Sequence, residues 1–259
     1  MTATAHEAPT ETTKTHQPLQ QLAHELWQRA NHHTESSSKQ YWVAIAGGPG
    51  SGKSTCAREV ALLLNSFQPN CCLVIPMDGY HYSQELLVEK YGQEGLKRKG
   101  APFTFDTTTL VQDLRHAKDD NSITQSMYFP DYSREASRPV ANAIHFDPNT
   151  HRIILVEGLY LLHERDPAWA PLQELWDERW WVEVPSRDEQ IERVVQRAFR
   201  TWNSLKRELW GDGMEGARTR TLYNDVPNME TIAYCRDCAD VIIETGNNAC
   251  RVYHRKACK

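Results

Sequence analysis

GGPGSGKST, residues 47–55, decides the fold of this chain. The stretch fits the pattern G-x-x-x-x-G-K-[ST], and it lies between an apolar run at 42–46 and an amphipathic segment at 54–66. Its glycines let the backbone curl so that N–H groups converge on phosphate oxygens, and the amino terminus of the following helix adds partial positive charge. A glycine-rich turn could match by chance, but the strand–loop–helix context disfavours it. The sequence therefore predicts a nucleoside triphosphate site.

The residues of this loop have separate expected roles. Lys53 is expected to reach the β- and γ-phosphates and to act in catalysis by neutralising charge, and Ser54 is expected to bind Mg²⁺ through its hydroxyl. The chain has neither the N-K-x-D base reader of GTPases nor the L-S-G-G signature of transporter ATPases, so both classes are disfavoured. The phosphate-binding set is expected to be Gly48, Gly50, Ser51, Gly52, Lys53, Ser54 and Thr55.

Strands and helices alternate along the rest of the chain. Five apolar runs read as strands, at 42–46, 72–77, 153–157, 180–184 and 240–244. Amphipathic stretches read as helices, at 19–30, 54–66, 107–117, 188–201 and 217–236. This alternation predicts an α/β fold with a five-stranded, mostly parallel sheet and helices on both faces. Residues 79–150 exceed what a single crossover needs, so we expect a functional insertion there.

Composition limits the class of protein. The polar, Thr-rich residues 1–17 read as a disordered leader, and 18–259 as a single domain. A net charge of −5 gives no basic field, so nucleic acid is not expected as a partner. No apolar run approaches the roughly 18 residues of a membrane span, so no membrane partner is expected. We expect a cytoplasmic protein. Whether it forms a homodimer is left open by the sequence.

Seven cysteines occur without a signal peptide. An odd number without a secretory context disfavours a disulfide framework. Zinc binding is the alternative, since two pairs of cysteines follow one another near the carboxyl terminus, but the second pair is spaced too widely for a familiar zinc knuckle. We therefore expect reduced, structurally incidental thiols at Cys235, Cys238, Cys250 and Cys258.

Two acids follow predicted strands. Glu157 ends the apolar run of IILVEG, where an acid can hold Mg²⁺, and Asp78 follows the second run, in PMDGYHY. In an open α/β sheet, ligands bind outside the carboxyl ends of the strands, so both acids should converge on the phosphate loop. Asp78 could there accept the proton of an attacking hydroxyl. The alternatives are an ordinary acid at a strand exit and an aspartate that caps a loop.

Taken in order, GGPGSGKST, MDGYH, KGAPFTFD, VEGLYLL and ND-x-x-N resemble the family of uridine kinase, phosphoribulokinase and type I pantothenate kinase. The resemblance is greatest to the fungal and bacterial members that carry a GAP-x-TFD segment. It covers the chain from about residue 19 to 245. It implies a P-loop kinase fold, ATP and Mg²⁺, an acceptor-binding insertion at about 79–150 and an arginine-bearing lid at about 193–216.

The resemblance also implies site residues. Asp78 matches the proposed catalytic base of the family, and lid arginines act on the transferred phosphate, which makes Arg193 and Arg197 catalytic candidates. Their helical spacing with Arg200 fits one face, although a solvated basic face is the alternative. The expected acceptor-binding set is Tyr80, His81, Arg98, Asp131, Tyr132, Arg134 and Arg138, and Lys99 beside Arg98 is a further candidate. Asn224 to Asn228 match an element expected to be structural.

Together these features predict ATP- and Mg²⁺-dependent phosphorylation of a hydroxyl group on a small molecule. A nucleoside such as uridine is the first candidate, because Tyr80, His81 and Tyr132 offer stacking surfaces and hydrogen-bonding edges. A sugar, pantothenate or another vitamin-like alcohol is the alternative acceptor. A catalytically inactive nucleotide-binding regulator is the alternative class, although Lys53, Asp78, Glu157 and the lid arginines are all present.

Overall fold

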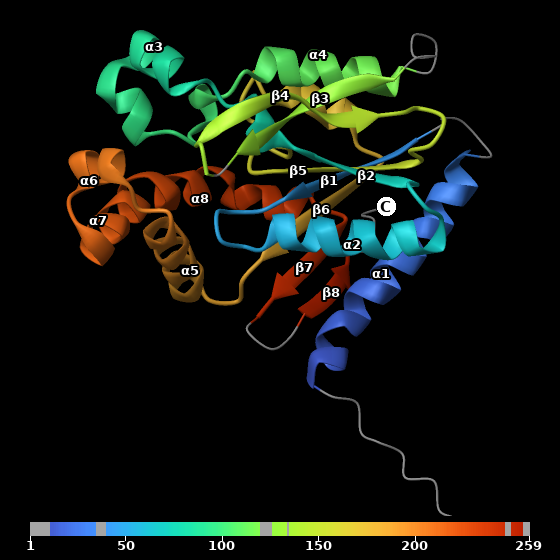
Figure 1. Cartoon of the computed structure of the whole chain (residues 1–259). Helices are drawn as coiled ribbons and strands as arrows, with labels where there is room; N and C mark the ends of the chain where they lie inside the picture. Colours follow the sequence, from blue (N-terminus) through green and yellow to red (C-terminus); the bar gives the residue numbers. More distant parts are fainter. Residues whose placement is uncertain (1–10, 35–39, 120–125, 134, 247–249, 256–259) are drawn as a thin grey trace, which may run out of the picture.

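The five predicted strands are present in the computed structural model, which describes residues 11–34, 40–119, 126–133, 135–246 and 250–255 (Figure 1). They are β1 (Tyr41–Ala46), β2 (Cys72–Pro76), β5 (Ile153–Gly158), β6 (Glu178–Glu183) and β7 (Val241–Thr245). These strands pair in parallel, in the order β2-β5-β1-β6-β7. Every residue of β1 and β5 is buried, which accounts for their unbroken apolar sequences.

A sixth strand extends the sheet beyond the five predicted ones. β8 (Cys250–His254) pairs antiparallel with β7, from Thr245 opposite Cys250 to Val241 opposite His254. Cys250 and Val252 pack against the core, whereas Arg251 and Tyr253 are exposed. This alternation is the signature of a strand with one solvated face, and it is too short to stand out in a polar segment.

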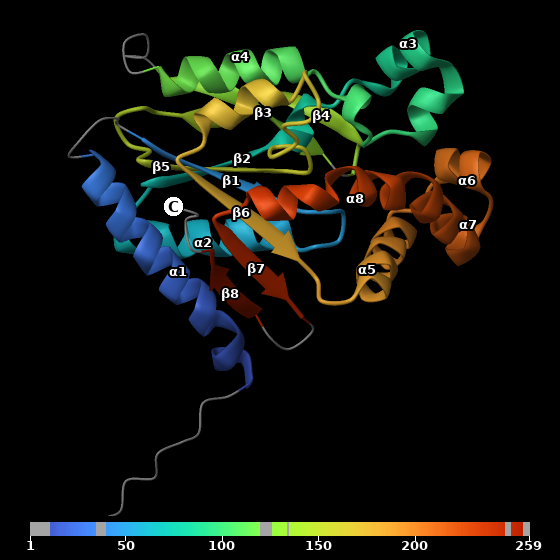
Figure 2. The same ribbon diagram turned by 180° about the vertical axis from the view of Figure 1, so that it is seen from behind.

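Helices cover both faces of the sheet, as predicted (Figures 1 and 2). On one face, alternate residues of β1 such as Val43 and Ile45 pack with α1 (Glu11–Thr34) and α2 (Lys53–Phe67). On the other face, Trp42 and Ala44 pack with α4 (Thr107–Lys118) and with the helical segments η3 (Ala170–Leu175), α8 (Val226–Ile232) and η5 (Ala233–Cys238). Parallel strands covered on both faces make a three-layer α/β fold.

α1 begins at Glu11, so it takes in residues 11–17, which the sequence analysis assigned to a disordered leader. The prediction was wrong for these residues, because the helix continues ahead of the buried stripe of Leu19, Leu22 and Leu26. Residues 1–10 lie outside the described part of the chain. None of the helices that the structure describes combines the length and the apolar character needed to cross a membrane.

The insertion between β2 and β5 contains helices and a separate hairpin. Its elements are η1 (Met77–Tyr80), α3 (Gln84–Lys97), η2 (Pro102–Thr104), α4, β3 (Met127–Ser133) and β4 (Arg138–Phe146). β3 and β4 pair only with each other, and their register shifts between Phe129 and Asp131. The hairpin backbone packs tightly on η1, because a Cβ added at Gly79 would lie 2.5 Å from the carbonyl oxygen of Pro130. That close approach requires the glycine of PMDGYHY.

The segment after β6 forms a helical projection beside α3 (Figures 1 and 2). It consists of α5 (Arg187–Arg200), α6 (Ser204–Trp210) and α7 (Gly213–Arg220). The predicted helix at 217–236 is continuous but irregular, since α7 passes through a π-helical segment, η4 (Thr221–Asp225), into α8 and η5. A π-helical segment of this kind often occurs at a functional site.

Candidate active site

The phosphate loop is held by neighbouring elements on both sides. Gly50 and Gly52 have φ angles of +77° and +93°, in the left-handed region where glycine is favoured, and Gly52 is the residue from which α2 begins. The hydroxyl of Thr245 in β7 donates to the carbonyl oxygen of Ser51 at 2.7 Å. The amide of Gln190 in α5 donates to the carbonyl oxygen of Pro49 at 2.8 Å. The loop is therefore shaped before any ligand binds.

A cavity of about 720 Å³ opens in front of this loop. Its lining includes Gly50, Gly52, Lys53, Ser54, Thr55, Asp78, Asp131, Tyr132, Glu157, Arg193 and Arg197. We call it the phosphate cavity. It lies between the carboxyl ends of β2 and β5 and the amino terminus of α2. This is the expected place, because ligands of an open α/β sheet bind outside the carboxyl ends of the strands. Asp78 and Glu157, predicted to converge on the loop, both lie here.

Two residues of the predicted phosphate-binding set, Gly48 and Ser51, are not among the lining residues of the phosphate cavity. A Cβ added at Gly48 would meet the side-chain amide of Gln190 at 2.6 Å. Ser51 is fully buried, and its hydroxyl has no hydrogen-bond partner within the described residues. Both residues shape the loop from the protein side, so a side chain at either position faces α5 or the core rather than the cavity.

The phosphate cavity fits a nucleoside triphosphate with Mg²⁺. The backbone turns at two left-handed glycines at the amino terminus of a helix, a typical cradle for phosphate oxygens. Lys53 is only 8% exposed and supplies a cation at the base of the cradle. Ser54 and the buried Glu157 supply hydroxyl and carboxylate oxygens, the ligands that Mg²⁺ prefers.

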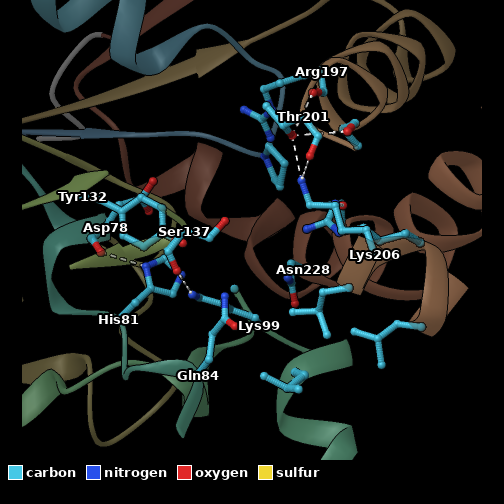
Figure 3. Close-up of a pocket in the computed structure, with 18 of the residues that line it drawn as sticks. Asp78, His81, Gln84, Lys99, Tyr132, Ser137, Arg197, Thr201, Lys206 and Asn228 are labelled. Atoms are coloured by element: carbon cyan, nitrogen blue, oxygen red, sulfur yellow. Dashed lines mark hydrogen bonds and ion pairs between the residues drawn. The ribbon is translucent and has the colours of Figure 1, made fainter. Parts of the chain in front are cut away.

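A second cavity, of about 250 Å³, adjoins the first (Figure 3). Lys53, Asp78, Tyr132 and Arg197 line both cavities. The second one also has walls from the insertion, from the lid helices and from α8. In Figure 3, Asp78, His81, Lys99, Tyr132 and Ser137 gather on one side, and Arg197, Thr201 and Lys206 of the lid segment on another. We call it the acceptor cavity.

Asp78 and His81 form one wall of the acceptor cavity. The Nδ1 atom of His81 donates to the backbone carbonyl oxygen of Asp78 at 2.8 Å, since a carbonyl can only accept. The His81 ring lies 3.9 Å from the Phe105 ring and 5.1 Å from the Tyr132 ring, measured between centroids. PMDGYHY thus ends the strand with an acid, a glycine that admits the hairpin, and a histidine held in an aromatic wall.

Tyr80 is a correction to the predicted acceptor set. Its side chain is 4% exposed, belongs to the hydrophobic core, and donates its hydroxyl to the Asp113 carboxylate at 2.9 Å. Burial, followed by the nearby Asp113 charge, raises the pKa of Tyr80 well above its usual value. In a short 3₁₀ helix, neighbouring side chains point in different directions, and here Asp78 faces the cavities while Tyr80 faces α4.

Arg98, Arg138 and Asp131 also lie elsewhere than the expected acceptor set implies. Arg98 donates to the backbone carbonyl of Tyr223 and to Asn228, both at 3.4 Å, and it lines neither cavity. Arg138 is exposed at the start of β4, again outside both linings. Asp131 lines the phosphate cavity, where it accepts from the Tyr132 backbone amide. Arg134 lies outside the described residues.

Lys99, rather than Arg98, faces the acceptor cavity. Its ammonium donates to the carbonyl oxygen of Ser137 at 2.7 Å and lies 5.3 Å from the centre of the Tyr132 ring. Burial lowers the pKa of Lys99 to about 8, partly offset by the charges of Asp78 and Glu85. The sequence feature that could have indicated this orientation of Lys99 is the next residue, Gly100. Its φ angle of +104° turns the chain directly after Lys99.

The ND-x-x-N element does more than hold the fold together. Asn224 donates to the backbone carbonyl of Lys99 at 2.7 Å, and Tyr160 donates to that of Gly100 at 2.8 Å, so the Lys99 loop is anchored from two sides. Asp225 and Asn228 line the acceptor cavity themselves. Asp225 forms an ion pair with Arg220 at 2.7 Å. The contact between Asn224 and Lys99 joins positions 125 residues apart, so sequence spacing could not reveal it.

Two of the three lid arginines, Arg193 and Arg197, face the cavities, and Arg200 does not. Arg193 lines the phosphate cavity, where it pairs with Glu189 at 2.7 Å and contacts Thr245 at 3.5 Å. Arg197 lines both cavities, whereas Arg200 lines neither. The helical face predicted from their spacing therefore points its first two members at the site.

The cysteines considered as zinc ligands lie in different surroundings. Cys235 is buried and donates to the Leu162 carbonyl at 3.1 Å, and Cys250 lies in β8 against the other core. Cys238 contacts the Glu164 carboxylate at 3.6 Å, and Cys258 lies outside the described residues. Among the described residues, no group of three or more histidine, cysteine or acidic side chains is arranged to hold a metal.

Known proteins resemble this chain over most of its length, although no protein-family model matches it. The "Putative uridine kinase C227.14" of Schizosaccharomyces pombe is 32% identical over 205 residues, which are 78% of this chain and 82% of that protein. The "Uridine kinase" of Clostridium botulinum strain Okra is 31% identical over 165 residues, or 64% of this chain and 70% of the other.

A solved structure also resembles this chain over most of its length. The "putative fructose transport system kinase" from Silicibacter sp. TM1040 is 30% identical and superimposes with a TM-score of 0.70. The match covers 88% of this chain and 98% of that one. The two relatives in sequence and this relative in structure differ in the substrate that their names give.

Proposed function

The chain belongs to the uridine kinase, phosphoribulokinase and type I pantothenate kinase family of P-loop kinases, and we propose that it transfers the γ-phosphoryl group of ATP to a hydroxyl group of a small molecule. One observation carries the proposal. Lys53, Asp78, Tyr132 and Arg197 line both cavities, so a phosphate donor in one and an alcohol in the other would meet between them. Positioning two reactants in this way is the main contribution of an enzyme to phosphoryl transfer.

Each residue at the junction has a defined part in the proposed reaction. The acceptor hydroxyl gives its proton to the Asp78 carboxylate, its oxygen forms a bond to the γ-phosphorus, and the bond from that phosphorus to the bridging oxygen breaks, which leaves ADP. Lys53 and Arg197 stabilise the negative charge on the transferring group. Arg193, paired with Glu189, supplies a further cation on the donor side.

Ser54 and Glu157 are the residues that would hold Mg²⁺. When bound, the ion neutralises charge on the phosphate oxygens. For this ion the protein supplies two groups on the donor side of Asp78, the hydroxyl of Ser54 and the carboxylate of Glu157. Glu157 is 6% exposed, so its carboxylate is largely shielded from water and keeps a strong field at the phosphates.

Uridine is the first acceptor to test, because relatives carry the name uridine kinase and because His81 and Tyr132 form an aromatic wall. A sugar or another small alcohol is the second. It gains support from the position of Tyr80 in the core, which removes one of the three expected stacking surfaces. A cytoplasmic location stays a prediction.

The experiment that tests the proposal is ADP release with Mg·ATP, for the native chain and for Asp78→Asn, against uridine, simple sugars and pantothenate. We expect one acceptor to stimulate ADP release and Asp78→Asn to lower kcat by about 10²- to 10⁴-fold, the usual contribution of a general base. ATP affinity, measured by calorimetry, should stay within about threefold. Asp237→Asn, which alters a carboxylate that is 77% exposed, is the matched control.

Two outcomes would contradict the proposal. If ATP binds but no acceptor raises ADP release, the chain is a nucleotide-binding regulator. If Asp78→Asn retains full turnover, the carboxylate at position 78 is not the base and the mechanism above is wrong.

A further inference from the structure

The acceptor cavity has an excess of positive charge. Five cationic side chains line it, namely Lys53, Lys99, Arg197, Lys206 and Arg220, against only two acids, Asp78 and Asp225. Arg220 and Asp225 neutralise each other in an ion pair at 2.7 Å. Lys53 and Arg197 also line the phosphate cavity, where the triphosphate and Asp78 would balance them. Lys99 and Lys206 remain as cations that belong to the acceptor side alone.

Lys99 is a half-buried cation that forms no ion pair with a described carboxylate, although the charges of Asp78 and Glu85 act on it from farther away. Its ammonium donates to one carbonyl oxygen, that of Ser137, and no described carboxylate lies within 4 Å of it. Loss of water around the side chain lowers the pKa of Lys99 to about 8. An ammonium has three N–H donors, and burying its charge without a counter-ion is unfavourable. A lysine of this kind in a cavity is more typical of a binding site than of a structural contact.

Lys206 provides a second such cation from the opposite wall. It lies in α6 of the lid and donates to the carbonyl oxygen and the hydroxyl of Thr201, at 2.6 and 2.7 Å. No described carboxylate lies within 4 Å of it, and burial and then the charge of Arg220 lower its pKa. Figure 3 shows Lys99 and Lys206 on different sides of the same space, with Asn228 between them.

Resting on the proposed kinase function, we propose that the acceptor carries an anionic group, a carboxylate or a phosphate, in addition to the hydroxyl that is phosphorylated. Lys99 and Lys206 bind this group, and Asn228 donates to it from α8. The hydroxyl lies toward Asp78, at the junction of the two cavities. A cavity of about 250 Å³ is below the usual range of ligand pockets, about 300–1,000 Å³, so the acceptor is compact.

Matched acceptors test the inference directly. ADP release is measured with neutral and anionic alcohols on the same scaffold: glycerol against D-glycerate and glycerol 3-phosphate, and ribose against ribose 5-phosphate, with uridine as the neutral nucleoside. We expect an anionic member to exceed its neutral partner by at least 10-fold in kcat/KM, because a charge-assisted hydrogen bond is about twice as strong as a neutral one. The two anionic glycerol derivatives distinguish a carboxylate from a phosphate.

Variants then locate the binding group. Lys99→Met keeps the length of the side chain and removes its charge, and we expect it to raise the KM of the anionic acceptor by about 10- to 100-fold. Lys206→Met should have a smaller effect of the same sign. Lys99→Arg should restore part of the affinity. Lys90→Met, on the exposed side of α3, is the control and should match the native chain.

Binding and stability give readouts that do not depend on turnover. Calorimetric affinity for the preferred anionic alcohol should fall in Lys99→Met while affinity for ATP is unchanged. The melting temperature of Lys99→Met should be equal to or higher than that of the native chain, because the substitution removes a half-buried charge that no described carboxylate pairs within 4 Å. If Lys99 instead serves only to hold Ser137, the melting temperature falls and KM does not change.

The inference and the proposed function fail in different ways. Efficient phosphorylation of uridine or ribose, with anionic acceptors no better, would overturn the inference and leave the kinase reaction in place. ATP binding without stimulation by any alcohol would overturn the proposed function itself. An anionic preference that Lys99→Met and Lys206→Met leave unchanged would contradict the assignment of these two residues.

Discussion

The phosphate cavity and the acceptor cavity differ in how the chain builds them. The first centres on one continuous loop, and its proposed phosphate-binding groups are the backbone at two left-handed glycines and the amino terminus of α2. The second is assembled from η1, the Lys99 loop, the lid and α8, and its proposed binding groups are side chains. Phosphate recognition therefore depends on local backbone geometry, whereas acceptor recognition depends on long-range contacts such as that between Asn224 and Lys99.

The comparison predicts that damage to the phosphate cavity is independent of the acceptor. Lys53→Met should lower kcat by about 10²- to 10³-fold with every acceptor, since it removes one preorganised charge that stabilises the transferring group. Steady-state kinetics with two different acceptors measures this. Lys53 also lines the acceptor cavity, so a loss that differs tenfold between acceptors would show that its ammonium contributes to acceptor recognition as well.

A second prediction concerns the backbone of the loop. Gly50→Ala should raise the KM for ATP by at least 10-fold and destabilise the fold by about 2 kcal/mol, because the residue has φ +77° and an added Cβ would lie 2.7 Å from Val194. Thermal unfolding and ATP titration measure the two effects. Gly213→Ala is the control, since φ there is +60° with no atom within 4 Å of the added Cβ. Equal effects in both variants would mean that strain, not contact with α5, limits the position.

A third prediction uses the pKa of Lys99, which burial lowers to about 8. In the proposed site the ammonium form binds the acceptor, so kcat/KM for an anionic acceptor should fall as the pH rises above about 8, by up to tenfold per pH unit. The other charged groups that line the cavity are Lys53, Asp78, Arg197, Lys206, Arg220 and Asp225, and the charge of Glu85 in α3 also acts on Lys99. In Lys99→Met, the decline above pH 8 should disappear. A decline that persists there would assign it to another group, of which Lys206 is the next to test.

The smallest predicted effect concerns the contact between the lid segment and the insertion. The hydroxyl of Tyr223 donates to Glu94 of α3 at 2.7 Å. The Trp210 ring lies 5.2 Å from the Tyr223 ring at an interplanar angle of 57°, and Lys97 lies near the Trp210 ring. Tyr223→Phe removes an exposed hydrogen bond worth about 1 kcal/mol or less, so the acceptor KM should rise about two- to threefold with the KM for ATP unchanged. Tyr128→Phe, on the outer face of the hairpin, is the control. An equal change in the KM for the acceptor and the KM for ATP would show that the contact does not act on acceptor binding specifically.

Sequence alone predicted the phosphate cavity better than the acceptor cavity, and the reason is physical. A glycine-rich loop between a buried strand and a helix is a local pattern, so Lys53, Ser54 and the position of Glu157 follow from a short stretch and the sheet topology. Tyr80 and Lys99 could not be assigned in this way. Tyr80 belongs to the core because α4 offers Asp113 as a partner, and Lys99 faces the cavity because Asn224 and Tyr160 anchor its loop.

The same contrast explains the errors in the fold. The five parallel strands were predicted because burial on both faces makes their sequences continuously apolar. β8 was missed because only Cys250 and Val252 pack inward, and the start of α1 was missed because its first residues are polar. Elements that bury one face carry weaker signals than elements that bury two.

The strand order has a consequence for biosynthesis. β1, made early, has as its neighbours β5 and β6, made more than 100 residues later, and the apolar stripe of α1 shares a core with Ile243 of β7 and Val252 of β8. A nascent chain that has not yet reached β7 leaves one edge of β6 open and part of that stripe uncovered, a state prone to aggregation. The nucleotide-binding loop thus leaves the ribosome well before β7 and acquires its final shape only afterwards, because Thr245 must arrive before it can hold Ser51.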